Sequence, residues 1–210
     1  MALADQLRLM VLTDPRVLKG RDPVAVCRAA VQGGASMIQV RWKDGAAADL
    51  LQLTQALVNA LPAPVLVNDR VDVALAAGAA GAHLGQGDPP VDALRPHVPP
   101  GFLLGVSVGS VAEAERVRAW PADYWSVGPC FPTANKPDAG PPLGAEGFAA
   151  LARLAPDGVP VIGVGGITAA NVVAIVRAGA AGVAVIGAVL ASPDPERAAR
   201  ALIAAFPGPA

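Results

Sequence analysis

Short apolar runs and longer amphipathic runs alternate along the whole chain, and this alternation constrains the fold more than any other feature. The apolar runs are typical of buried strands and cover residues 7–12, 37–40, 65–67, 82–84, 103–107, 124–127, 161–164 and 182–186. The amphipathic runs are typical of helices and cover residues 23–32, 46–61, 71–77, 91–97, 111–120, 145–154, 169–177 and 195–206. Strict alternation predicts parallel strands joined by crossover helices.

Eight such units without a long linker favour closure of the sheet into a (β/α)8 TIM barrel, which is an α/β fold. We expect one barrel domain that covers residues 1–210. An open, doubly wound sheet is the alternative, because a sequence does not show whether the first and last strands pair.

Composition and charge exclude several classes of protein. The net charge is -1, so the chain has no basic field for nucleic acid. Two cysteines, Cys27 and Cys130, lie far apart and match no metal or redox spacing, which favours a reducing compartment. The first residues lack the cationic start and apolar core of a signal peptide, and the longest uncharged span, 158–176, contains glycine and proline. We therefore expect a cytoplasmic protein without nucleic-acid or membrane partners.

The chemistry of a barrel lies where its strands run into helices. The polar residues and glycine turns at these positions are Gln39, Arg41, Lys43, Asn68, Asp69, Gln86, Asp88, Ser107, Lys136, Gly165, Gly166, Ile186 and Gly187. The carboxylates of Asp69 and Asp88 have no His or Cys beside them, which suits Mg²⁺. Arg41, Lys43 and Lys136 suit a polyphosphate, and the two glycine turns suit a phosphate held by backbone amides. The set predicts one Mg²⁺-bound diphosphate and one separate monophosphate.

A long loop, residues 127–144, has no apolar periodicity and carries proline and glycine on both sides of Lys136. Long loops of this kind in compact domains are usually functional or disordered. We interpret it as an active-site loop that presents Lys136 to an anion. The alternative is a solvated surface loop.

Several of these residues also have structural interpretations. Arg41 could pair with Asp69 or Asp88 merely to neutralise buried charge. Lys43 could be a solvated residue at the rim. His83 lies within a short apolar run and is expected to be a hydrogen-bonded core histidine instead of a catalyst.

Seven segments, taken in order, resemble the thiamine phosphate synthase family. They are residues 12–14, 39–43, 67–74, 83–88, 105–107, 128–144 and 165–168, within a stretch from about residue 9 to residue 195. The resemblance implies an enzyme that joins a hydroxymethylpyrimidine diphosphate to a thiazole phosphate, or to its carboxylated form. The products would be thiamine phosphate and pyrophosphate.

The resemblance also implies roles for individual residues. Asp69 and Asp88 would bind Mg²⁺. The implied substrate contacts are Arg41, Asn68, Ser107 and Lys136 to the diphosphate, Gln39 to the pyrimidine, Thr133 to the thiazole substrate, and the amides around Gly165, Gly166, Ile186 and Gly187 to the thiazole phosphate. Lys43 and Asn135 complete the expected substrate-binding set, and Arg41, Ser107 and Lys136 are expected to promote departure of the diphosphate. A homodimer is left open.

Three positions depart from the family pattern. Val108 and Gly109 stand where the family often has a small residue and then His, Asn135 stands in place of a second Thr, and Gly187 stands in place of Ser. These departures bear on substrate affinity more than on the type of reaction. A related thiazole tautomerase, which has an acid–base His at the place of Gly109, is the nearest alternative. A catalytically silent phosphate-binding barrel and another barrel isomerase are the others.

Overall fold

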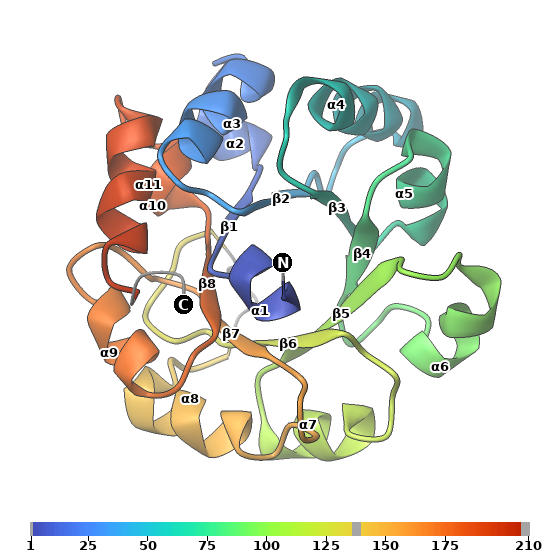
Figure 1. The fold of residues 1–210 in the computed structure, drawn as a ribbon, viewed down its shortest axis with the longest axis vertical. Helices are drawn as coiled ribbons and strands as arrows, with labels where there is room; N and C mark the ends of the chain where they lie inside the picture. The colour runs from blue at the N-terminus through green and yellow to red at the C-terminus, as the bar shows by residue number, and fades with distance from the viewer. Residues whose placement is uncertain (1, 136–139, 207–210) are drawn as a thin grey trace.

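The computed structural model describes residues 2–135 and 140–206, and within them eight parallel strands form a closed barrel (Figure 1). The strands are β1 (Leu9–Leu12), β2 (Met37–Val40), β3 (Val65–Asn68), β4 (Gly81–Leu84), β5 (Leu103–Val108), β6 (Tyr124–Val127), β7 (Val161–Val164) and β8 (Gly182–Val185). Each strand pairs with the next, and β8 pairs with β1. The predicted (β/α)8 barrel is confirmed, and the open sheet is excluded.

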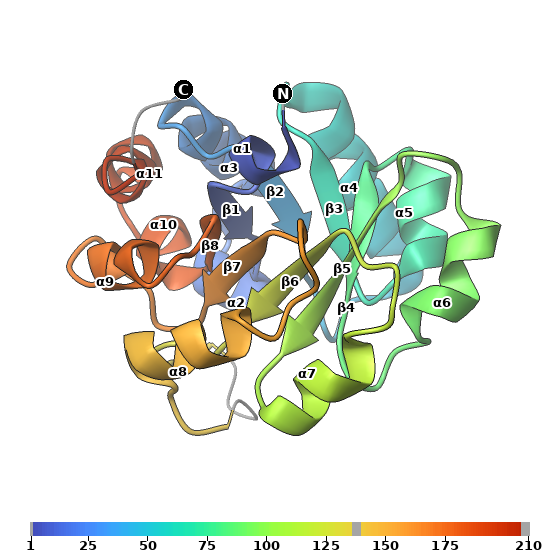
Figure 2. The ribbon, with the colours of Figure 1, turned by 60° about the horizontal axis from the view of Figure 1, so that its bottom comes forward.

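Helices lie around the barrel, and one lies across its end (Figure 1). They are α1 (Leu3–Gln6), α2 (Pro15–Leu18), α3 (Pro23–Gln32), α4 (Ala47–Ala60), α5 (Val71–Ala77), α6 (Val91–Leu94), the 3-10 helix η1 (Arg95–His97), α7 (Val111–Val117), α8 (Gly144–Ala152), α9 (Val172–Arg177), α10 (Gly187–Leu190) and α11 (Pro195–Ile203). Helix α1 lies across the end of the barrel where the strands begin (Figures 1 and 2). In the part of the chain that the structure describes, no helix has the length and apolar character needed to cross a membrane.

Differences from the predicted elements have local causes. The first predicted strand starts at Leu9 instead of residue 7, because α1 ends at Gln6 and Leu7 is its C-cap. The predicted helix 91–97 divides into α6 and η1, since Pro96 has no amide hydrogen for a continuous α-helix. Helices α1, α2 and α10 were not predicted, and the remaining elements end within about three residues of their predicted bounds.

The core has two layers, because successive strand side chains point to opposite faces of the barrel wall. The barrel interior is filled by Met10, Met37, Leu66, Tyr124 and Ile162, all fully buried. A larger layer of aliphatic side chains packs between the strands and the surrounding helices. The interior at the end where the strands begin is therefore a packed core, which leaves the end where the strands finish for a site, as in other barrels.

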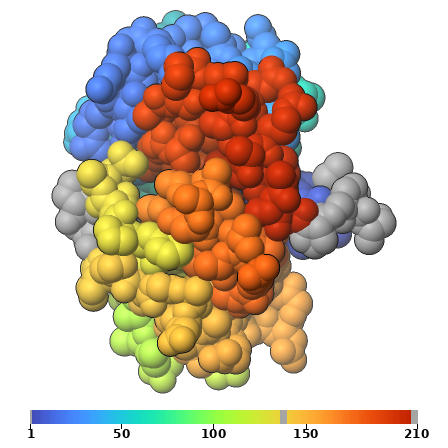
Figure 3. Space-filling view, turned by 90° about the vertical axis from the view of Figure 1, so that its left-hand side faces the viewer, coloured from blue at the N-terminus to red at the C-terminus, as the bar shows by residue number. Residues whose placement is uncertain are grey.

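Glycine permits the close approach of backbones that closes the ring. A Cβ on Gly182 at the start of β8 would lie 1.8 Å from the Leu7 carbonyl oxygen. A Cβ on Gly33, after α3, would lie 2.1 Å from the Glu196 carbonyl oxygen in α11. Figure 3 shows the C-terminal segment, in red, against the N-terminal segment, in blue. Both glycines are needed where the two ends of the chain meet.

Candidate active site

A cavity of about 940 Å³ opens at the carboxyl ends of the strands. A volume of this size is typical of small-molecule sites. The predicted site residues that line it are Gln39, Arg41, Lys43, Asn68, Asp69, Asp88, Ser107, Thr133, Asn135, Gly165, Gly166, Ile186 and Gly187. Lys136 lies outside the described residues. The strand-end rule and, for Thr133 and Asn135, the family resemblance thus predicted residues that all line one cavity, within the part of the chain that the structure describes.

Two carboxylates face each other on one wall of the cavity. Asp69 follows β3 in the left-handed conformation, with φ 64°, and both Asp69 and Asp88 line the cavity. Oδ2 of Asp88 accepts a hydrogen bond of 2.7 Å from the amide of Gly85. Burial and the facing charge of Asp88 raise the pKa of Asp69 to about 6. Two half-buried carboxylates that repel each other in this way are an arrangement that a bound cation would stabilise.

The donor set fits a hard divalent cation that takes its other ligands from water and substrate. Among the described residues, no group of three or more His, Cys, Asp and Glu side chains could hold a metal. Mg²⁺ commonly binds through one or two carboxylates, several waters and substrate phosphates. The pair Asp69 and Asp88 matches this pattern. It does not match a structural zinc site, which takes four protein ligands.

Arg41 is buried and points its guanidinium at Asp14. Its Nη1 lies 2.8 Å from Oδ2 of Asp14, and the two side chains are 7% and 2% exposed. The suggestion that Arg41 pairs with Asp69 or Asp88 was therefore wrong about the partner. Burial opposes ionisation of Asp14, but hydrogen bonds from Arg16 and the charges of Arg16 and Arg41 outweigh it, so the pKa of Asp14 is lowered.

Asp14 supports the site through Arg41, and the sequence analysis did not name it among the strand-end residues. It caps α2, where its side chain accepts a hydrogen bond of 2.9 Å from the amide of Arg16. An acidic residue immediately after a strand and before Pro15 is a recognisable helix start, and that signal could have found it. Asp14 fixes the position of Arg41, which also lines the cavity and for whose guanidinium no second hydrogen-bond partner is found among the described residues.

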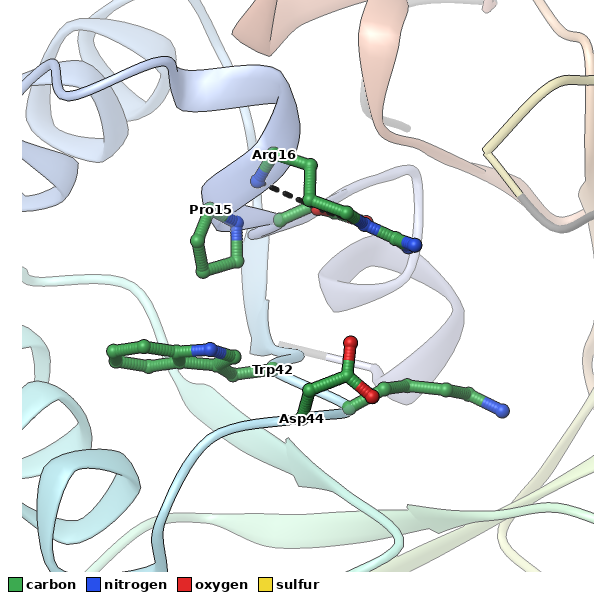
Figure 4. A pocket seen from close by; sticks show the side chains of 6 residues that line it. Pro15, Arg16, Trp42 and Asp44 are labelled. Atoms are coloured by element: carbon green, nitrogen blue, oxygen red, sulfur yellow. Dashed lines mark hydrogen bonds and ion pairs between the residues drawn. The ribbon is translucent and has the colours of Figure 1, made fainter.

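A small pocket of about 40 Å³ lies at the rim beside this ion pair (Figure 4). Pro15 and Trp42 face each other across it, and Arg16 and Asp44 lie at its edge. Lys43 also lines the pocket and is exposed. The pocket is too small for an organic substrate, so the chemistry belongs to the large cavity.

Gln39 has an unpaired oxygen buried in the cavity wall. The residue is 2% exposed, and within the described residues its Oε1 has no hydrogen-bond partner. Its Nε2 donates only a weak contact of 3.2 Å to Sδ of Met10. A buried amide without partners is unfavourable unless a ligand supplies them. Gln39 is thus suited to bind a heterocycle that offers both a donor and an acceptor.

His83 lies at the floor of the cavity and is 6% exposed. Its Nδ1 lies 2.9 Å from the hydroxyl of Tyr124, and its Nε2 lies 2.9 Å from Oγ of Ser107. The prediction of a hydrogen-bonded core histidine is confirmed. The contact of His83 with Ser107 was not predicted from the sequence.

The opposite wall is built from the turns after β7 and β8. Gly165 and Gly166 both have positive φ, 91° and 64°, and both pack against the long loop. A Cβ on Gly166 would lie 2.5 Å from the Pro132 carbonyl oxygen. After β8, a Cβ on Gly187 would lie 3.2 Å from Nδ2 of Asn135. These turns therefore present backbone to the cavity and hold the loop in place.

Comparisons with known proteins agree along most of the chain. A family model described as thiamine monophosphate synthase matches residues 9–189. The thiamine-phosphate synthase of Roseiflexus castenholzii is 48% identical over 195 residues, which are 91% of this chain and 85% of that protein. The thiamine-phosphate synthase of Methanoculleus marisnigri is 48% identical over 198 residues, 92% of each chain.

The fold of this chain also matches a solved structure from the same group of enzymes. Thiamine phosphate pyrophosphorylase from Pyrococcus furiosus matches with a TM-score of 0.87 and 33% sequence identity, and the match covers 97% of both chains. The fold, the site and the sequence thus point to one group of enzymes, and this chain belongs to the thiamine monophosphate synthase family.

Proposed function

We propose that this chain transfers a pyrimidinylmethyl group from hydroxymethylpyrimidine diphosphate to the nitrogen of a thiazole phosphate, giving thiamine phosphate and pyrophosphate. The observation that carries the proposal is the cavity itself. One wall holds a carboxylate pair suited to a metal-bound diphosphate, and the other holds glycine turns suited to a monophosphate. A tautomerase would have no use for the carboxylate pair.

Asp69 and Asp88 would hold Mg²⁺ on the first wall. The close approach of their side chains, together with the raised pKa of Asp69, supports this assignment. When bound, the ion would neutralise the charge that develops on the departing diphosphate.

Arg41, Asn68 and Ser107 would bind the diphosphate oxygens next to this pair. Arg41 is permanently charged and held by Asp14, so it can stabilise the leaving group without moving. Lys136, outside the described residues, would add a second cation from the loop. These residues favour the charge-separated transition state more than the ground state.

Gln39 would bind the aminopyrimidine. Its buried Oε1 can accept a hydrogen bond from the exocyclic amine, and its amide NH₂ can donate to a ring nitrogen. An electron-rich aminopyrimidine stabilises a benzyl-type cation after the diphosphate leaves. Binding energy at Gln39 would orient that cation toward its acceptor.

The thiazole phosphate would occupy the opposite wall. Backbone amides at Gly165, Gly166, Ile186 and Gly187 would bind its phosphate, and Thr133 and Asn135 would contact the rest of the molecule. Anchoring the phosphate holds the thiazole nitrogen close to the cation, so capture competes with water.

No covalent intermediate with the protein is needed. Burial raises the pKa of the Cys130 thiol to about 12, which leaves it unreactive near neutral pH. Ser107 has His83 beside it, but the substitution at a cationic carbon requires a leaving-group contact and no protein nucleophile. The proposed step breaks the carbon–oxygen bond to the diphosphate and then forms the carbon–nitrogen bond to the thiazole.

Incubation of the purified protein with both substrates and Mg²⁺ tests the proposal. Thiamine phosphate and pyrophosphate should form in equal amounts, and excess chelator should stop the reaction. Asp88→Asn should lower turnover by about 100-fold or more, as expected when a metal ligand loses its charge. Asp92→Asn, an exposed carboxylate on α6, is the matched control and should keep full activity. Absence of product under all these conditions would refute the proposal.

The cytoplasmic location expected from the sequence, and the homodimer that the sequence leaves open, belong to the same proposal. Both cysteines are free and buried, which suits a reducing compartment. Sedimentation of the purified protein measures the oligomeric state directly.

A further inference from the structure

Three residues occupy one row across neighbouring strands, and the first of them, His83, lines the cavity. In the sheet register, His83 of β4 pairs with Gly105 of β5, and Gly105 pairs with Tyr124 of β6. A Cβ on Gly105 would lie 2.1 Å from Cζ of Tyr124 and 2.5 Å from its hydroxyl oxygen. The tyrosine ring thus uses the space that any other residue at position 105 would fill. Through that gap it reaches His83, with ring centroids 5.5 Å apart.

The direction of the hydrogen bond between these rings follows from burial. Tyr124 is fully buried, and burial raises its pKa, so the hydroxyl keeps its proton. Among the described residues, Nδ1 of His83 is the one partner found for that hydroxyl, at 2.9 Å. If Nδ1 carried a hydrogen, the tyrosine proton would be buried without an acceptor, which is strongly unfavourable. Tyr124 therefore donates to Nδ1, and the ring hydrogen of His83 is on Nε2.

The second ring nitrogen of His83 determines the orientation of the Ser107 hydroxyl. Nε2 of His83 lies 2.9 Å from Oγ of Ser107, so Nε2–H donates and the serine oxygen accepts. Ser107 follows Gly105 by two residues and lines the cavity on the same face of β5. Its carbonyl is held by a hydrogen bond of 2.5 Å from Nε2 of Gln86. The serine proton is then left to point into the cavity.

We propose that Tyr124 and His83 are positioning residues that fix the Ser107 hydroxyl as a hydrogen-bond donor toward an anionic oxygen in the cavity. The inference rests on the proposed function, in which that oxygen belongs to the diphosphate. A serine free to rotate could equally present its lone pairs to the anion, which would repel it. Tyr124 donates to His83 and His83 donates to Ser107, and we call this chain of hydrogen bonds the relay. The relay orients the Ser107 hydroxyl before the substrate arrives.

The first experiment measures the tautomer without any activity assay. The sequence has only two histidines, so ¹⁵N spectra of the ring nitrogens are simple, and His83→Gln identifies the signals of His83. The wild type should show the Nε2–H tautomer near neutral pH. Tyr124→Phe should shift the signals toward a mixture of the two tautomers. An Nδ1–H or fully protonated ring in the wild type would overturn the inference.

The second experiment measures affinity for pyrophosphate with Mg²⁺ by calorimetry, in the wild type, Tyr124→Phe, Ser107→Ala and the double variant. Tyr124→Phe keeps the ring and should weaken binding about 3- to 10-fold, the usual loss for one hydrogen bond. In the Ser107→Ala background the same change should have almost no further effect, because the relay then has nothing to orient. Additive losses would overturn the inference.

Conservative replacement and a packing control separate positioning from structural damage. His83→Gln keeps an amide donor that can reach Ser107 and should bind pyrophosphate better than His83→Leu. Trp125→Phe changes the next residue of β6, which is equally buried but faces the outer layer, and should not alter pyrophosphate affinity. Equal binding by His83→Gln and His83→Leu would count against the relay.

Activity measurements distinguish failure of this inference from failure of the proposed function. If the wild type makes thiamine phosphate and Tyr124→Phe matches it in both turnover and pyrophosphate affinity, the relay is wrong and the function stands. If the wild type makes none but the binding data show coupling of Tyr124 to Ser107, the relay is right and the proposed reaction is wrong. For an active enzyme, the KM of the thiazole phosphate should change less than twofold in Tyr124→Phe.

Discussion

Replacement of Asp69 by Asn should stabilise the protein in excess chelator, although it removes a proposed metal ligand. The pKa of Asp69 rises from 3.8 to about 6, so ionising it is harder in the folded protein than in the unfolded chain. For a fully buried carboxyl this shift would correspond to about 3 kcal/mol of lost stability. Because Asp69 is only half-buried, solvent screening reduces the expected gain on removing the charge to about 1–2 kcal/mol.

The pH dependence follows from the direction of the shift. When the pKa of a carboxyl is higher in the folded protein than in the unfolded chain, the folded protein is more stable with the group protonated. That stabilisation is lost as the pH rises toward 6. The electrostatic part of the Asp69→Asn advantage should therefore be absent near pH 3.8, grow up to about pH 6, and stay constant above it. Urea denaturation at several pH values measures this. Near pH 8 the midpoint of thermal unfolding should rise by about 3–6 °C for a chain of this size.

A control variant and the addition of Mg²⁺ extend this test. Asp72→Asn removes an exposed carboxylate whose pKa is lowered by a hydrogen bond from Arg70, so it should give no gain. Asn also adopts the left-handed backbone of position 69 more readily than Asp, and that part of the gain should not vary with pH. A gain of equal size at pH 4 and pH 8, or no gain at pH 8, would refute the electrostatic argument. Saturating Mg²⁺ should reverse the order by stabilising only the wild type.

Three further predictions concern other parts of the molecule. Asp14→Asn should destabilise the fold by about 2 kcal/mol at pH 7, because the buried Arg41 loses its counter-ion, and the difference should shrink in denaturation curves as pH falls below 4. Gly182→Ala should cost about 3 kcal/mol or more in urea denaturation, since its Cβ would overlap a carbonyl oxygen, whereas Gly78→Ala, with nothing within 4 Å, should cost about 1 kcal/mol. Lys136→Arg should retain more turnover than Lys136→Gln if the lysine acts as a charge on the leaving group, and equal turnover would contradict that role.

Most of the fold could be predicted because burial in a barrel leaves a strong pattern. A strand such as β6, Tyr124–Val127, is buried on both faces and reads as an apolar run, and α5, Val71–Ala77, ends at a left-handed Gly78. The short helices α1, α2 and α10 each have four residues, which is too few for a helical period. Of these, α2 has a start signal in Asp14 and Pro15.

The site could be predicted only as a set of positions. A residue at a strand end of a parallel barrel must lie at the same face as the others, and that rule alone brought Asp69, Asp88 and Ser107 to one cavity. The partners of each side chain did not follow from it. Arg41 pairs with Asp14 across two strands, and this depends on rotamers and register that the sequence does not specify.

Gly105 shows how the strand register determines which side chains become partners. In the sequence it is one glycine inside an apolar run, where glycine weakens a strand and offers no side chain to pack. In the barrel it lies between His83 and Tyr124, and its missing Cβ is what lets the two side chains touch. A glycine in a buried strand can thus mark a functional contact between its two neighbours, and Gly105→Ala should break that contact by displacing the Tyr124 ring. The variant should then lose pyrophosphate affinity as Tyr124→Phe does. Gly105 would thus affect the site through Tyr124, with which it pairs in the sheet, and not through a contact of its own.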